Sequence, residues 1–212
     1  MKSDLSLGKT TLIAIKFFLL AIVGVISTLM TFVPAKAHHP FEGREPELFN
    51  SIEGILSGLA HPILGVDHLL FLLSIGLVGT LSITRWIPLL LFSGLLGTLL
   101  SWVFPMVIPG LEMVIGISLL VSVLVSKGLI KPGVMLPLIA CHGYALGQAM
   151  IGAEPTPLMA YLLGLFLSQG IIILSGIIAL RNFVNFKNIF VGVFVGSGIV
   201  FTYSTLADIL GM

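Results

Sequence analysis

Residues 60–68 read Ala60-His61-Pro62-Ile63-Leu64-Gly65-Val66-Asp67-His68, and the arrangement of helices that the sequence predicts depends on how this stretch folds. It lies inside an apolar segment, about residues 52–82, which is too long for one membrane-spanning helix and too short for two. Pro62 removes a backbone donor and Gly65 permits unusual dihedral angles, so we expect the helix to break here. The sequence therefore predicts a short helix over about residues 51–60, a break, and a full helix from about Gly65 to Leu81.

The whole chain is strongly apolar. Of its 212 residues, 57% are hydrophobic and 9% are charged, and the mean hydropathy is +1.17. Soluble proteins contain about 25% charged residues, so this composition excludes a cytosolic enzyme. No basic patch is present that could neutralise phosphates, which excludes a nucleic-acid-binding protein. We predict an all-α integral membrane protein that is embedded in the lipid bilayer.

The first 37 residues have the pattern of a cleavable signal peptide. Lys2, Lys9 and Lys16 precede an uncharged apolar run over residues 17–33, and Ala35-Lys36-Ala37 follows. A basic start, an apolar stretch and a small-x-small end predict cleavage after Ala37. The alternative is an uncleaved first transmembrane helix, because the run is about 17 residues long. We expect three units: a signal peptide (1–37), a short extracytoplasmic segment (38–50) and a membrane domain (51–212).

Five further apolar segments follow, at about residues 86–105, 109–126, 133–152, 157–180 and 187–210, each long enough for one span. With the mature N-terminus outside, the inner loops hold most of the basic residues, as the positive-inside rule requires: Arg85, Lys127, Lys131, Arg181 and Lys187. We therefore predict a six-span bundle with a broken first helix and both ends extracytoplasmic. GxxxG pairs at Gly54/Gly58, Gly143/Gly147 and Gly192/Gly196 indicate close helix packing. The sequence leaves the oligomeric state open, a homo-oligomer included.

Ionisable side chains at membrane depth are costly and usually functional, and three of them lie close together in residues 61–68. On a straight helix His61 and His68 would lie about 10.5 Å apart along the axis, so only a kink can bring them to one ion. Imidazole and carboxylate ligands without thiolate suit nickel, cobalt or zinc. Asp67 is either a third ligand or an acceptor that orients a ring N–H. The alternative for the whole cluster is a structural hydrogen-bond network that locks two helices together.

Four further residues are candidates for metal contact. His142 lies in the middle of a predicted span and is either a ligand or a structural histidine. Glu112, near the outer end of its span, is an entrance carboxylate or a boundary charge. His38 and His39 begin the mature chain, where a free amine and two imidazoles form a chelating set, unless they are chance histidines in a tail. Asp208 is expected to make a polar contact at a helix end.

The His61-x5-Asp67-His68 pattern, preceded by a signal peptide and by His38-His39-Pro40-Phe41, resembles the HupE/UreJ family. Its members are small bacterial membrane proteins with about six spans, regarded as secondary permeases for nickel or cobalt. The resemblance is strongest over residues 58–76. It implies that His61, Asp67 and His68 are needed for metal passage, and it implies a location in the cytoplasmic (inner) membrane.

A second motif of that family, HGxAHGxE, is matched only in part. Residues 142–149 keep the first His and the three small residues after it, His142, Gly143, Ala145 and Gly147. The second His and the Glu of the motif are replaced by Leu146 and Ala149. The acidic residue of the family's third span corresponds to Glu112, so the resemblance favours metal contact at both Glu112 and His142.

The main hypothesis is a secondary permease, not an enzyme, that imports Ni²⁺ or Co²⁺ through an intramembrane His/Asp site. The transported ion is the only metal expected, with no cofactor, and no P-loop pattern for nucleotide binding is present. One alternative is an intramembrane zinc hydrolase of a lipid amide, in which the metal would lower the pKa of a bound water. The other is a membrane factor that delivers metal for metalloenzyme assembly.

Overall fold

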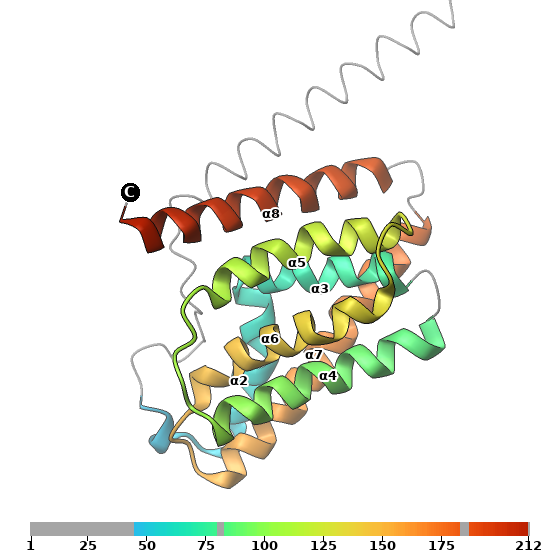
Figure 1. The fold of residues 1–212 in the computed structure, drawn as a ribbon. Helices are drawn as coiled ribbons and strands as arrows, with labels where there is room; N and C mark the ends of the chain where they lie inside the picture. The colour runs from blue at the N-terminus through green and yellow to red at the C-terminus, as the bar shows by residue number, and fades with distance from the viewer. Residues whose placement is uncertain (1–44, 80–82, 183–186, 212) are drawn as a thin grey trace, which may run out of the picture.

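The chain is almost entirely helical in the residues that the structure describes. A computed structural model describes residues 45–79, 83–182 and 187–211. In these residues the α-helices are α2 (Ser51–Leu64), α3 (Val66–Gly79), α4 (Ile83–Val103), α5 (Leu111–Ser126), α6 (Met135–Gly147), α7 (Pro155–Asn182) and α8 (Lys187–Leu210) (Figure 1). Short 3-10 helices cover Pro46–Leu48, Pro132–Val134 and Gln148–Met150, and no strand occurs in the described ranges. The all-α prediction is confirmed, while the signal peptide, His38 and His39 lie outside the described residues.

Three of these helices are long and apolar enough to cross a membrane: α4 over Thr84–Val103, α7 over Pro155–Asn182 and α8 over Asn188–Leu210. The bent pair formed by α2 and α3 is a fourth candidate span. Helix α5 is a shorter apolar helix, and α6 has 13 residues, which corresponds to about 20 Å. Within the described residues, the apolar segment at about 52–82 and the five segments that follow it each contain a helix, whereas the count of six spans and their orientation remain predictions.

The predicted break lies at Gly65. Asn50 caps α2 by accepting hydrogen bonds from the N–H groups of Ile52 and Glu53, and Glu53 accepts one from Asn50 in return. Helix α2 continues to Leu64, four residues beyond its predicted end, and α3 begins at once with an axis turned by 78°. Pro62 lies inside α2, so its predicted role as the break is wrong: it removes only the bond to residue 58, near the helix end.

Glycines let the helices pack closely. The most extensive helix contacts are α2 with α7, α4 with α6, and α5 with α8, and α3 connects these pairs by packing against α7 and α5. A Cβ atom at Gly54 or Gly58 would collide with α7, and one at Gly143 or Gly147 would collide with α4. Two of the three predicted GxxxG pairs therefore lie at helix contacts, whereas Gly192 of the third pair faces open space.

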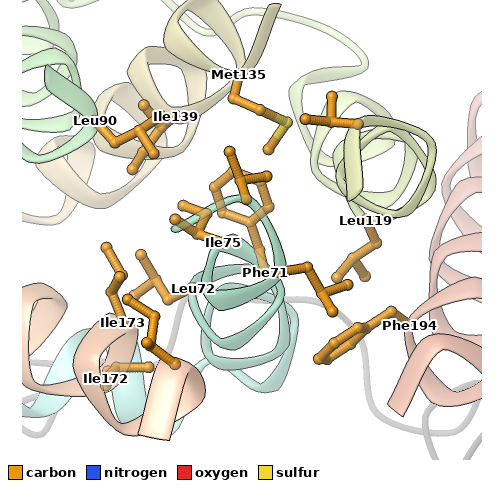
Figure 2. Close-up of a cluster of buried hydrophobic side chains, with 14 of the residues drawn as sticks. Phe71, Leu72, Ile75, Leu90, Leu119, Met135, Ile139, Ile172, Ile173 and Phe194 are labelled. Carbon is orange, nitrogen blue, oxygen red and sulfur yellow. The ribbon is translucent and has the colours of Figure 1, made fainter. Parts of the chain in front are cut away.

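Helix α3 lies at the centre of the bundle. Its side chains Phe71, Leu72 and Ile75 are fully buried among residues from the surrounding helices, Leu90, Leu119, Met135, Ile139, Ile172, Ile173 and Phe194 (Figure 2). Large apolar side chains are exposed on the outside of α4, α7 and α8, as a lipid-facing surface requires. This arrangement places the first turn of α3, which carries Asp67 and His68, beside α5, α6 and α8.

Candidate metal site

The break at Gly65 brings the two motif histidines together. The ring centroids of His61 and His68 are 6.0 Å apart, with the rings edge to face. On a straight helix the two residues would be separated by about 10.5 Å along the axis. His61 is fully buried and His68 is 3% exposed. The predicted folding of His61 towards His68 is therefore confirmed.

His61 is held from the far side by Tyr161 of α7. The Tyr161 hydroxyl lies 3.1 Å from Nδ1 of His61 and donates to the Leu146 carbonyl at 2.7 Å. Tyr161 is also fully buried. One hydroxyl thus connects α2, α7 and α6 at the level of the break.

His68 contacts His142 of α6. Nδ1 of His68 lies 3.2 Å from Nδ1 of His142, and Nε2 of His142 lies 2.9 Å from the hydroxyl of Ser118 on α5. The ring of Phe71 stacks on His142 with a centroid distance of 3.5 Å and an interplanar angle of 7°. These contacts fix the His142 ring on one face and at both nitrogens, and the residue is only 1% exposed.

Helix α4 fixes the position of His142 through the backbone of α6. The Thr98 hydroxyl donates to the Gly143 carbonyl at 2.9 Å, and the Trp102 indole N–H donates to the Gly147 carbonyl at 2.8 Å. Both acceptors are the glycines of the partly matched second motif. Because those residues lack side chains, α6 lies close enough to α4 for these bonds to form.

A cavity of about 370 Å³ opens beside His68. Three carboxylates from three helices line it: Asp67 of α3, Glu112 of α5 and Asp208 of α8. Gln148 also lines it and donates to the Met106 carbonyl at 2.9 Å. Among the described residues that line the cavity there is no lysine or arginine, so its fixed charges favour a cation.

The structure groups the predicted residues in two overlapping sets. His61, His68 and His142 form the buried set, and Asp67, His68 and Glu112 line the cavity, with His68 common to both. In the described ranges no hydrogen bond joins Asp67 to a histidine ring; Tyr161 and His142 bond the rings instead. No three His, Cys, Asp or Glu side chains among the described residues are arranged to hold one ion.

The sequence did not single out Ser118 and Tyr161, which contact His142 and His61 from helices far along the chain. Asp208, expected to make a polar contact at a helix end, also lines the cavity. Asp208 did carry a signal, because it is an ionisable residue near the end of an apolar segment. Ser118 and Tyr161 carry none, since serine and tyrosine are common in membrane helices.

A family model described as HupE / UreJ protein matches residues 14–206. Neither the curated proteins nor the solved structures gave a match. Since the family model covers most of the sequence, the chain belongs to the HupE/UreJ family, whose members are generally linked to nickel or cobalt uptake or to metalloenzyme maturation.

Proposed function

We propose that the protein is a secondary permease that imports a divalent transition-metal ion, Ni²⁺ or Co²⁺, across the bacterial cytoplasmic membrane. The observation that carries the proposal is the cavity of about 370 Å³, which joins Asp67, Glu112 and Asp208 to the buried ring of His68. An open, negatively charged chamber that ends on a buried imidazole is an arrangement suited to collecting a cation and stripping its water.

The ion enters the chamber hydrated and exchanges water for protein donors. The carboxylates raise its local concentration, and His68 offers nitrogen at the inner wall, with His61 next to it at a centroid distance of 6.0 Å. Imidazole and carboxylate together suit Ni²⁺ and Co²⁺ better than Mg²⁺ or Ca²⁺, which prefer oxygen ligands alone. The membrane potential drives the ion inwards with about 4.6 kcal/mol per 100 mV, twice the value for one charge.

Metal accumulation in cells tests this proposal. Cells that express the intact protein receive Ni²⁺, Co²⁺ or Zn²⁺ at submicromolar concentration, and membrane levels of every variant are matched by immunoblot. We expect His68→Ala to reduce accumulation to the level of cells without the protein and Glu112→Gln to reduce it in part. Glu154→Gln is the matched control, because Glu154 is exposed and does not line the cavity.

Two results contradict the proposal. Equal accumulation in wild-type and His68→Ala cells would refute transport through this site. Unchanged cellular metal together with a loss of metalloenzyme activity on deletion would refute import and assign the protein to metal delivery.

A further inference from the structure

Two hydroxyl groups set the direction of the hydrogen bonds around the buried histidines. Tyr161 donates its proton to the Leu146 carbonyl at 2.7 Å, and Ser118 donates its proton to the Ile115 carbonyl at 2.5 Å. A hydroxyl has one proton and a carbonyl can only accept. Neither hydroxyl therefore has a proton left for a histidine, and each must accept one from the imidazole beside it.

The Ser118 hydroxyl determines the tautomer of His142, and His142 in turn determines which nitrogen of His68 carries the proton. Nε2–H of His142 donates to the Ser118 oxygen at 2.9 Å. In a neutral imidazole the other nitrogen is then an acceptor, so Nδ1 of His142 accepts from Nδ1–H of His68 at 3.2 Å. The lone pair of His68 is left on Nε2.

The tautomer of His61 is set in the same way by Tyr161. Its Nδ1–H donates to the Tyr161 oxygen at 3.1 Å, because the Tyr161 proton is used by Leu146. The lone pair of His61 is again on Nε2. Two separate chains of hydrogen bonds, one ending at α6 and one at α5, thus give both motif histidines the same tautomer.

A metal ion binds an imidazole lone pair and not an N–H, and a metal-binding histidine usually has its other nitrogen held by an acceptor. His142 cannot serve as a ligand in this arrangement, because both of its nitrogens are engaged and Phe71 covers one face. We infer that His142 and Ser118 are positioning residues that hold His68 with its Nε2 lone pair available to the transported ion, and that Tyr161 fixes His61 in the same tautomer. This inference rests on the proposed function and replaces the predicted role of His142 as a ligand.

The tautomers can be measured without metal. In purified protein labelled with ¹⁵N-histidine, nitrogen NMR distinguishes Nδ1–H from Nε2–H, and single histidine variants assign the signals. We expect Nδ1–H at His61 and His68, and Nε2–H at His142. Ser118→Ala removes the acceptor and should give a mixture of tautomers at His142 and His68. Ser122→Ala is the matched control, because Ser122 is equally buried on α5 and donates to the Leu119 carbonyl, with no histidine contact among the described residues. An Nε2–H tautomer at His68 in the wild-type protein would overturn the inference.

The affinity for metal distinguishes a positioning role of His142 from a role as a metal ligand. Isothermal titration calorimetry of purified protein with Ni²⁺ and Co²⁺ should show that His142→Ala weakens binding about 10- to 100-fold, the usual effect of losing an outer-shell partner. His142→Asn should restore most of the affinity, since its Oδ1 occupies about the position of Nδ1 and accepts the bond from His68. Equal losses in both variants would mean that His142 binds the ion itself and would overturn the inference.

These measurements are independent of transport. Tautomers and affinities as expected, in a protein that gives no metal accumulation in cells, would contradict the permease and leave the positioning role intact. Accumulation that depends on His68, combined with the opposite tautomer, would contradict only the positioning role.

Discussion

Removing one oxygen atom from Tyr161 should weaken both the fold and the site. Tyr161→Phe deletes the hydroxyl that bonds to His61 at 3.1 Å and to the Leu146 carbonyl at 2.7 Å, where Tyr161 and His61 are both fully buried. Each buried polar group that loses its partner costs about 1–3 kcal/mol, and local relaxation recovers part of this. We therefore expect the free energy of unfolding to fall by about 2–4 kcal/mol, since the volume change is too small to add a cavity cost.

The assay is equilibrium unfolding in mixed micelles, followed by tryptophan fluorescence. Tyr203→Phe is the matched control: Tyr203 is 63% exposed on α8, and its loss should change stability by less than about 0.5 kcal/mol. A double-mutant cycle with His61→Ala isolates the contact, for which we expect a coupling of about 0.5–3 kcal/mol. Strictly additive losses, or a Tyr161→Phe protein as stable as the wild type, would refute the hydrogen-bond assignment.

Asp208→Asn should raise the metal concentration for half-maximal uptake by roughly 3- to 10-fold without lowering the maximal rate, as uptake kinetics would show, because one of three attracting charges is lost. Gly143→Ala should lower the thermal unfolding temperature, since the added Cβ meets the α4 backbone and overpacking costs about 1–3 kcal/mol, whereas Gly170→Ala, with nothing within 4 Å, should not. Asn50→Ala should lower the free energy of unfolding by about 1 kcal/mol, and with it the unfolding temperature, because the α2 cap is removed. An unchanged unfolding temperature would show that α2 does not depend on this cap.

The sequence predicted the local features of this protein well. The low charge content indicated a membrane bundle, and Gly65 marked the break between α2 and α3. Periodicity could not fix the end of α2, because a proline near a helix end costs one backbone bond and the next turn can close behind it. Nor does apolar length show whether the short helices α5 and α6 cross a membrane.

The candidate site was predictable only where its residues are neighbours in sequence. His61, Asp67 and His68 stand out because charged and polar side chains are rare in such a segment. Their partners come from other helices: Tyr161 is separated from His61 by 100 residues, and His142 from His68 by 74. Contacts of this kind depend on how the helices pack, which a single sequence does not encode in any local pattern.

Because of the 78° turn between α2 and α3, the two histidines of the motif belong to separate helices. His61 belongs to a helix that rests on α7, and His68 to one that rests on α7 and α5, so the chain between them does not set their spacing. If residues 61–68 were grafted onto another helical protein, the motif would be present in the sequence, but the two histidines would not have the same spacing. Substitutions on the face of α7 that supports both helices should therefore change the geometry of the site as effectively as changes to the motif, although that face lies far along the chain.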